Sequence, residues 1–230
     1  MFDRIAGRYD LLNRVISFRL DRKWREQSIR LLLARGAQRI LDLGTGTGDL
    51  ALNAAVISAG RARIVGLDFS LEMLRLAERK RRDARHGEKV FFVGGSALDA
   101  PFKDAVFDGV VTAFVLRNVS DLGVFFKQAL RVLKPGGTLV TLDMFPLPKG
   151  WFSKFYSIYF YRVVPWIGGV LAGDHSAYQY LSESVRRFHP PENVADVIRD
   201  AGFGQVTIRK FLCGAVCMHI AEKPAEMQTH

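Results

Sequence analysis

The sequence predicts a doubly wound α/β fold, in which a parallel sheet carries helices on both faces. Three observations lead to this prediction. Strand-like and helix-like segments alternate between residues 39 and 143. The expected strands are nearly continuous apolar runs, as in Phe107–Ala113, which is typical of strands covered on both faces. A glycine-rich turn joins the first of these strands to the first of these helices.

The alternating part of the chain is read from its apolar periodicity and from its turn residues. Lys134-Pro135-Gly136-Gly137 marks a turn before the last strand of this part. The expected elements in chain order are strand Arg39–Leu43, helix Asp49–Ala59, strand Arg63–Leu67, helix Ser70–Arg85, strand Lys89–Gly94, strand Phe107–Ala113, helix Asp121–Val132 and strand Thr138–Asp143.

The segments on either side complete a single domain of residues 1–230. Residues 1–35 form a cationic, amphipathic helical cap, whose second helix runs from about Asp21 to Ala34. Residues 144–190 interrupt the alternation with an aromatic stretch that is too broken by charges, proline and glycine to span a membrane. Residues 191–222 supply a helix and two strands, Phe203–Lys210 and Phe211–Glu222, which we expect to pair antiparallel.

Composition and charge limit the functional classes. The chain is 49% hydrophobic and 24% charged, as in an ordinary soluble protein, and it carries a formal charge of +10. An excess of this size indicates an anionic partner, either nucleic acid or an acidic membrane surface, unless the protein is merely soluble and basic. Cys213 and Cys217 are poorly spaced for a disulfide, and Met1–Arg4 lacks the apolar core of a secretory leader. We therefore expect a reducing cytoplasm.

The glycine turn, Gly44-Thr45-Gly46-Thr47-Gly48, is the first candidate binding site. Glycines permit backbone conformations closed to other residues and let a ligand lie against bare backbone. The spacing is one residue shorter than the G-x-G-x-x-G of dinucleotide sites, and Asp49 stands where a pyrophosphate would lie. With Asp42 at the end of the strand, two carboxylates favour a cationic nucleoside ligand without phosphate. S-adenosylmethionine fits these requirements.

Two later segments support a nucleoside site. Asp68 ends the second strand, where a carboxylate can accept hydrogen bonds from both ribose hydroxyls. Phe69 is placed to stack on the adenine, and Ser70 is a good helix N-cap whatever the ligand. The loop after the third strand, with Ser96 and Ala97, would line the adenine side of the crevice. The predicted cofactor-binding residues are Asp42, Gly44, Thr47, Gly48, Asp68, Phe69, Ser96 and Ala97.

The segments 42–48 and 131–137 resemble two motifs of class I S-adenosylmethionine-dependent methyltransferases. More specific segments resemble the quinone-biosynthesis C-methyltransferases, a family that acts on demethylmenaquinol and prenylated benzoquinols. They are Phe2–Asn13 with Ser17 and Trp24, then Leu116–Asp121, then Gly173–Leu181 with Ser184, Val185 and Phe188. The resemblance covers residues 2–222. It implies the seven-stranded, Rossmann-like class I fold, with the last two strands closing the sheet and one of them antiparallel.

Carried over by position, the family's cofactor contacts fall on Thr47, Asp68, Ser96 and Ala97. A family serine beside the fourth strand falls on Ala113, whose side chain cannot form a hydrogen bond. The chain also departs from the family pattern at Asp21, Ser96, Val115, Asp143 and Phe145. Asp21, Val115 and Asp143 border the expected acceptor pocket, so these departures bear on the acceptor more than on the cofactor.

The resemblance implies C-methylation of a prenylated quinol ring, most simply demethylmenaquinol to menaquinol. A ring carbon becomes more nucleophilic once a neighbouring hydroxyl loses its proton, so a nearby base or hydrogen-bond acceptor would help. Candidates from the family-like segments are Asp143, Asp174, His175 and Tyr178, while Arg117 or Asn118 would hold the phenolate oxygen. Surface or turn roles for Asp174 and His175 remain alternatives. No metal site is expected.

A polyprenyl substrate resides in the bilayer, so we expect peripheral attachment to the inner, anionic face of the membrane. Three alternatives remain: a methyltransferase for another small apolar acceptor, a nucleic-acid methyltransferase, and a non-catalytic cofactor-binding subunit of a quinone-synthesis complex. The nucleic-acid reading lacks both an appended RNA-binding module and an Asn-Pro-Pro-Tyr-type motif. The sequence leaves open an assembly of identical chains.

Overall fold

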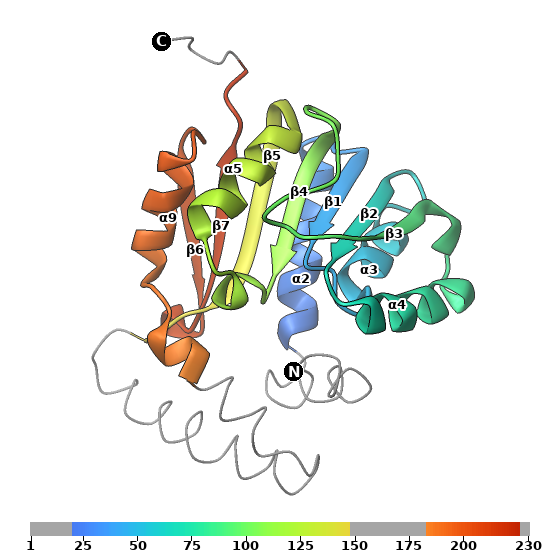
Figure 1. The fold of residues 1–230 in the computed structure, drawn as a ribbon, viewed down its shortest axis with the longest axis horizontal. Helices are drawn as coiled ribbons and strands as arrows, with labels where there is room; N and C mark the ends of the chain where they lie inside the picture. Colours follow the sequence, from blue (N-terminus) through green and yellow to red (C-terminus); the bar gives the residue numbers. More distant parts are fainter. Residues whose placement is uncertain (1–19, 148–182, 226–230) are drawn as a thin grey trace, which may run out of the picture.

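The computed structural model describes residues 20–147 and 183–225, which form a sheet of seven strands with helices on both faces (Figure 1). The strands are β1 Arg39–Leu43, β2 Arg63–Asp68, β3 Val90–Gly94, β4 Phe107–Ala113, β5 Leu133–Met144, β6 Val206–Phe211 and β7 Val216–Glu222. Their order is β3-β2-β1-β4-β5-β7-β6. β7 pairs antiparallel with both β5 and β6, and the other described pairs are parallel, so the predicted fold class is confirmed.

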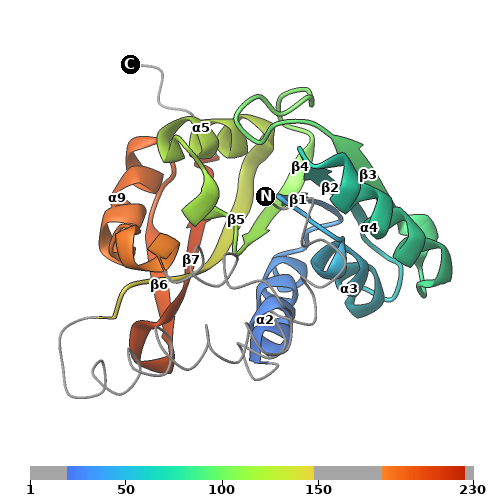
Figure 2. The same cartoon turned by 60° about the horizontal axis from the view of Figure 1, so that its bottom comes forward.

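The strand order places a crevice next to β1. The chain builds β1, β2 and β3 outward in one direction and then returns to add β4 on the other side of β1. Connections therefore leave the carboxyl ends of β1 and β4 in opposite directions, and ligands of doubly wound sheets bind at this kind of switch point. Figure 2 turns this end of the sheet toward the viewer.

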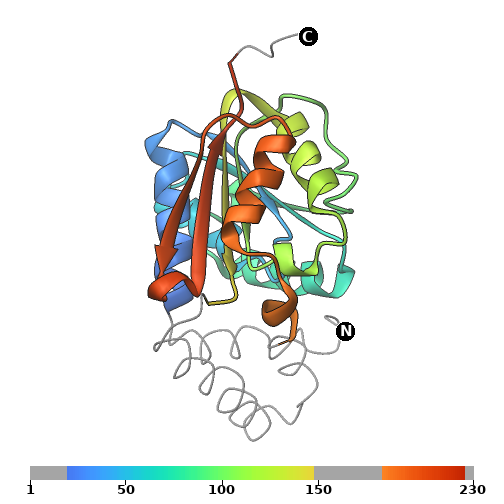
Figure 3. The ribbon, with the colours of Figure 1, turned by 90° about the vertical axis from the view of Figure 1, so that its left-hand side faces the viewer.

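Five helices flank the sheet in the described part of the chain, and a shorter helical segment, residues 183–187, precedes the last of them. The five helices are α2 Leu20–Ala34, α3 Asp49–Ile57, α4 Leu71–Asp83, α5 Leu122–Val132 and α9 Pro191–Asp200. Figure 3 shows α2 on one face and α5 with α9 on the other. Helix α3 packs beside α2, and α4 packs along β3 and β2 at the sheet edge. Short 3-10 turns η1 Gly87–Lys89, η2 Leu116–Asn118 and η4 Leu212–Gly214 join some of these elements.

The sheet separates two apolar cores, which explains why its strands are apolar throughout. On one side Ile40 packs with Ile29 and Leu32 of α2, and all three are fully buried. On the other side Leu41 packs in the cluster that contains Phe125 and Phe126 of α5. Burying each such side chain stabilises the fold by roughly 1.5–3 kcal/mol. Residues adjacent in the strand, such as Ile40 and Leu41, thus pack into cores on opposite faces of the sheet.

Most element boundaries fall within two residues of the predicted ones, and β1 and β4 match them. The start of β5 is a correction, because the strand begins at Leu133 and not at Thr138. Phe107 pairs with Leu133 and Gly109 with Thr138, so the intervening residues form an irregularity inside the ladder. The Gly136 N–H donates to the Lys223 carbonyl at 2.9 Å, and the Lys223 N–H donates to the Gly137 carbonyl at 2.8 Å. These bonds extend the β5–β7 ladder into the expected turn.

The closing strands are also shorter than predicted. Strand β6 begins at Val206, and β7 begins at Val216 after η4. Leu212, Cys213 and Gly214 all have positive φ, 46°, 55° and 96°, so two residues with side chains join one glycine in an unexpected turn. Residues 1–19 of the predicted cap and 148–182 of the predicted aromatic insertion lie outside the described residues. Within the described ranges, no helix is long and apolar enough to cross a membrane.

Candidate functional site

A cavity of about 180 Å³ lies at the carboxyl ends of β1, β2 and β4, where the strand order reverses. Its walls come from the glycine turn, the end of β2, the loop after β3 and the segment after β4. The lining residues are Gly44, Gly46, Leu67, Asp68, Phe69, Met73, Gly95, Ser96, Ala97, Leu98, Phe114, Val115, Asn118, Val119 and Ser120. Five of the eight predicted cofactor residues therefore line the same cavity: Gly44, Asp68, Phe69, Ser96 and Ala97.

The glycine turn needs its glycines for two separate reasons. Gly44, Gly46 and Gly48 all have positive φ, between 56° and 80°, which disfavours residues with a Cβ. A Cβ on Gly44 would also lie 2.5 Å from the Val115 side chain. The Gly44 N–H donates to the Leu67 carbonyl at 2.8 Å, which ties the turn to the end of β2. The backbone of the turn is thereby presented bare to the cavity.

Asp68 is oriented by two backbone amides. One carboxylate oxygen accepts the Gly46 N–H at 2.7 Å, and the other accepts the Ser70 N–H at 2.9 Å. Ser70 in turn caps α4 as predicted, because its Oγ accepts the Met73 N–H at 3.2 Å. Each carboxylate oxygen has further acceptor capacity. Asp68 is therefore a fixed acceptor in the cavity wall, suited to a pair of hydroxyl groups.

Phe69 lies on the rim of the cavity and is 72% exposed. Its neighbour Leu71 is 63% exposed. A large aromatic ring left in water at the mouth of a cavity is available to stack on a flat ligand. The predicted adenine contact is consistent with this position.

Asp42 and Asp49, whose negative charges led us to predict a cationic ligand, do not line the cavity. Asp42 is 1% exposed and accepts a hydrogen bond from Thr45 Oγ1 at 2.7 Å. Burial raises the pKa of Asp42 to about 7, against the opposing effects of Thr45 and of Arg25. Asp49 forms an ion pair with Lys80 at 2.6 Å. Neither lines the cavity, so their role in attracting a cationic ligand stays a prediction.

Thr47 and Gly48 do not line the cavity. Thr47 is 4% exposed, and its Oγ1 accepts a hydrogen bond from Lys80 Nζ at 2.9 Å. Gly48 is the N-cap of α3, and a Cβ there would lie 2.6 Å from the Phe92 ring. The packing of the turn accounts for both residues. Their direct contact with a cofactor stays a prediction.

On the acceptor side, η2 places Asn118 in the cavity wall and Arg117 beside it. Arg117 Nε forms an ion pair with Asp143 Oδ1 at 2.5 Å, and Asp143 is fully buried at the end of β5. Burial raises the pKa of Asp143, and the charge of Arg117 opposes that rise. Asp143 does not line the cavity, so it is placed to hold Arg117. The predicted candidates Asp174, His175 and Tyr178 lie outside the described residues.

Sequence reasoning missed a part of the wall, namely Phe114 and Val119–Ser120. Phe114 has a φ of 64°, which is uncommon for a bulky residue and typical of strained functional turns. The Arg25 guanidinium from α2 lies 5.2 Å from the centre of the Phe114 ring. The sequence offered one signal for these residues, which is that they directly follow β4, the strand next to β1.

The sequence matches the model of the ubiE/COQ5 methyltransferase family over residues 1–223. A demethylmenaquinone methyltransferase of Thermus thermophilus is 45% identical, over 97% of this chain and 100% of its own length. A ubiquinone/menaquinone biosynthesis C-methyltransferase UbiE of Desulfotalea psychrophila is 41% identical, over 95% of this chain and 87% of its own. The match to the family model takes in both the cap and the insertion.

A solved structure confirms the fold. The chain superposes with a TM-score of 0.65 on an S-adenosylmethionine-dependent methyltransferase of Thermotoga maritima, described as a possible histamine N-methyltransferase. The two are 19% identical, and the match covers 96% of this chain and 97% of the other. A structural likeness at this identity shows the fold alone, whereas the sequence relatives show the family. The chain therefore belongs to the ubiE/COQ5 methyltransferase family, whose members are S-adenosylmethionine-dependent enzymes.

Proposed function

We propose that this enzyme transfers the methyl group of S-adenosylmethionine to a ring carbon of a prenylated quinol, converting demethylmenaquinol to menaquinol. The observation that carries the proposal is the 45% identity to a demethylmenaquinone methyltransferase along nearly the whole of both chains. Several other relatives at 37–42% identity have the same name.

The cavity fits this cofactor. Asp68, fixed by the amides of Gly46 and Ser70, is suited to accept the ribose hydroxyls. Phe69 and the Ser96–Ala97 wall offer the adenine side, and the bare backbone of Gly44 offers a close approach. When bound, S-adenosylmethionine supplies an activated methyl group on a sulfonium. The protein has mainly to align the two reactants and exclude water.

On the acceptor side, we assign Asn118 and Arg117 to the quinol oxygen. Asn118 lines the cavity next to Val119 and Ser120, and the side chain of Arg117 is 5% exposed. A guanidinium beside the ring hydroxyl would favour the phenolate, because opposite charge stabilises the ionised form. Asp143 supports this role by holding Arg117, whose Nη1 also donates to Ser184 Oγ at 3.4 Å. Asp174, His175 and Tyr178 remain the candidates for a general base.

We also propose that the enzyme works while attached to an anionic membrane surface, without inserting into it. The net charge of +10 supports electrostatic attraction to acidic lipids. Arg22 and Lys23 are exposed at the start of α2, at the end of the sheet that carries the cavity (Figure 1). A substrate with a polyprenyl tail would be met at that surface.

A methyl-transfer assay tests the function. The purified enzyme is given S-adenosylmethionine with a radiolabelled methyl group and reduced demethylmenaquinone, in parallel with a demethylated benzoquinol. Labelled menaquinone is the expected product. Labelling of the benzoquinol alone would reassign the acceptor, and no labelling of either would support a non-catalytic subunit or a different acceptor. Accumulation of a demethylated quinone in cells that lack the protein would identify the substrate independently.

A further inference from the structure

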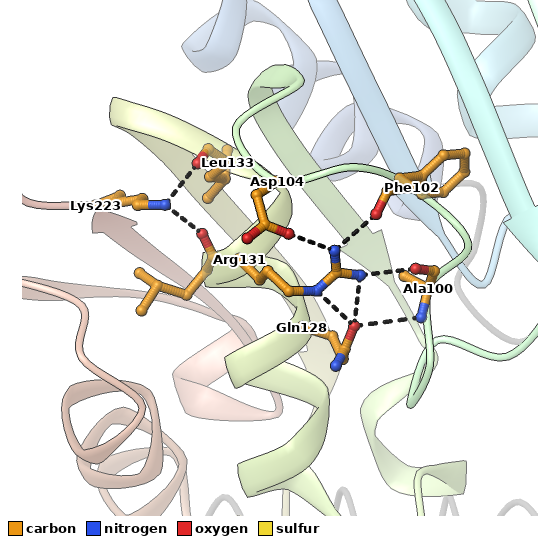
Figure 4. A network of polar contacts seen from close by, with 8 residues as sticks. Ala100, Phe102, Asp104, Gln128, Arg131, Leu133 and Lys223 are labelled. Carbon is orange, nitrogen blue, oxygen red and sulfur yellow. Dashed lines mark hydrogen bonds and ion pairs between the residues drawn. The ribbon is translucent and has the colours of Figure 1, made fainter.

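Arg131, in the last turn of α5, binds a loop that is far from it in sequence. Its Nη1 donates to the Phe102 carbonyl and to Asp104 Oδ1, both at 2.7 Å. Its Nη2 donates to the Ala100 carbonyl, also at 2.7 Å. Gln128, one turn earlier, accepts from the same guanidinium and from the Ala100 N–H, so side chains of α5 bind the loop together (Figure 4).

The loop of residues 95–106 is also the adenine-side wall of the cavity. Its first residues, Gly95–Leu98, line the cavity, whereas its later residues, Ala100–Asp104, carry the bonds to Arg131. Over residues 95–106 the backbone forms one isolated bridge, Ser96 with Asp99, and no strand or helix. The wall is therefore not stiffened by a ladder of its own.

The loop is held at its two ends. At the start, the Gly95 N–H donates to the Asp68 carbonyl at 2.9 Å, next to the predicted ribose acceptor. At the end, the Ala105 N–H donates to the Arg131 carbonyl at 3.0 Å, so Arg131 binds the loop by main chain and side chain. Without the guanidinium, the Phe102 carbonyl would lose its charged donor, and the Ala100 carbonyl would keep the Phe102 N–H, which it accepts at 2.8 Å. The loop would thus lose charge-assisted hydrogen bonds to α5, at the expense of local order.

Lys223 in turn holds the end of α5 that carries Arg131. Lys223 Nζ donates to the Leu130 and Leu133 carbonyls at 2.9 and 2.8 Å, and it thereby satisfies carbonyl groups at the C-terminus of α5 (Figure 4). Lys223 is 8% exposed. The end of the helix that presents Arg131 is therefore tied to the residue that follows β7.

We propose that Arg131 is a positioning residue for the cofactor: by clamping Ala100, Phe102 and Asp104 it fixes the shape of the Gly95–Leu98 wall, and so sets the affinity for S-adenosylmethionine without touching it. This inference rests on the cavity being the cofactor site. The guanidinium is required because its planar fork reaches three oxygens of the loop at once. A lysine keeps the charge but offers a single point donor.

The test compares wild type with Arg131→Lys by titration calorimetry, using S-adenosylhomocysteine as the probe and no quinol. We expect the dissociation constant to rise about tenfold, the equivalent of losing one or two charge-assisted hydrogen bonds. In the methyl-transfer assay, KM for S-adenosylmethionine should rise by a similar factor, while kcat at saturating cofactor stays within about twofold. Arg199→Lys, in an exposed pair with Asp196 on α9, is the matched control and should leave both constants unchanged.

Hydrogen exchange of the full-length, ligand-free proteins gives a second readout. The amides of residues 95–99 should exchange faster in Arg131→Lys, while those of β4 and β5 keep wild-type protection. A wild-type dissociation constant in the variant would overturn the clamp, as would unchanged exchange of the loop. A uniform loss of protection would also overturn it, because it would indicate general destabilisation. Failure of the wild type to bind the probe would instead overturn the cofactor site itself.

Discussion

Asp68 combines two functions in one side chain. Its oxygens fix the glycine turn through the Gly46 amide and the start of α4 through the Ser70 amide. The same carboxylate is the acceptor that we assign to the ribose. Removal of the whole side chain would therefore disturb the turn as well as the binding site, and a substitution that keeps the shape is more informative.

Asp68→Asn is expected to weaken S-adenosylhomocysteine binding by roughly 10- to 100-fold, because the amide loses one acceptor oxygen and its charge. The fold should persist, since the remaining carbonyl can still accept a backbone amide. Calorimetry measures the affinity, and Asp196→Asn on the exposed face of α9 serves as the control. An affinity close to that of wild type would remove Asp68 from the ribose assignment.

Asp42 makes the stability of the protein depend on pH. Burial raises its pKa from an ordinary 3.8 to about 7 in the folded protein. Between these values the folded state binds the proton more tightly than the unfolded state, so the contribution of Asp42 to stability is lost as pH rises through this window. Arg25 and Thr45 moderate the rise, and Asp68 adds to it.

Asp42→Asn should remove this pH dependence while its side-chain carbonyl still accepts the Thr45 hydroxyl. Urea denaturation at about pH 5 and about pH 8 measures the change. We expect wild type to lose more stability than the variant over this interval. His219, whose pKa is lowered to about 4 by burial, acts in the opposite direction but is common to both proteins. Parallel pH profiles would refute the assignment to Asp42.

At the level of elements, Lys80 joins α4 to the start of α3. Its Nζ bonds Thr47 Oγ1 and Asp49 Oδ1, which lie 33 and 31 residues earlier in the chain. The pair is partly exposed, so its effect on global stability is small, at most about 1 kcal/mol. Its structural effect is to hold the end of the glycine turn against the neighbouring helix.

Thr47→Val should therefore weaken cofactor binding about two- to tenfold, and Lys80→Met at least as much, because it also releases Asp49. The double variant should bind no more weakly than Lys80→Met, since Thr47 acts through its bond to Lys80. Calorimetric affinities of the three variants provide the test. Additive losses would instead support the sequence-based prediction that Thr47 contacts the cofactor by itself.

Elements were predictable where pattern and environment agree. β1 and β4 are short apolar strands bounded by turn residues, and their limits were predicted to the residue. The start of β5 was not, because the bonds between Lys223 and the Gly136–Gly137 segment join parts of the chain far apart in sequence. The site shows the same division. Local signals identified Gly44, Asp68 and Ser96, whereas the Lys80–Asp49 ion pair and the Arg131 clamp depend on tertiary contacts.

The whole molecule is strongly basic, and its charge bears on where it works. Long-range attraction to acidic lipids needs no specific contact, but it is screened by salt. Exposed Arg22 and Lys23 lie at the cavity end of α2, whereas exposed Lys127 and Arg199 lie on the helices of the opposite face (Figure 3). Charge reversal at one pair or at the other therefore distinguishes binding by one end of the molecule from attraction by net charge alone.

Flotation with anionic vesicles is expected to carry the protein at low salt and to fail at roughly 0.5 M salt. Reversing Arg22 and Lys23 to glutamate should reduce binding more than the same reversal at Lys127 and Arg199, although both double variants have the same net charge. Equal losses would indicate attraction by net charge alone. Absence of binding at any salt concentration would refute the attachment to membranes.

The position of β7 has a consequence for how the protein folds during its synthesis. β6 leaves the ribosome before β7, yet β7 lies between β5 and β6 in the finished sheet. Until β7 emerges, β5 exposes an unpaired edge and β6 has no place to dock. Lys223, which braces the helix end that carries Arg131, follows β7 directly. During synthesis the cofactor cavity can thus reach its final shape only after residue 223 has been released, so a nascent chain should bind S-adenosylmethionine weakly until then.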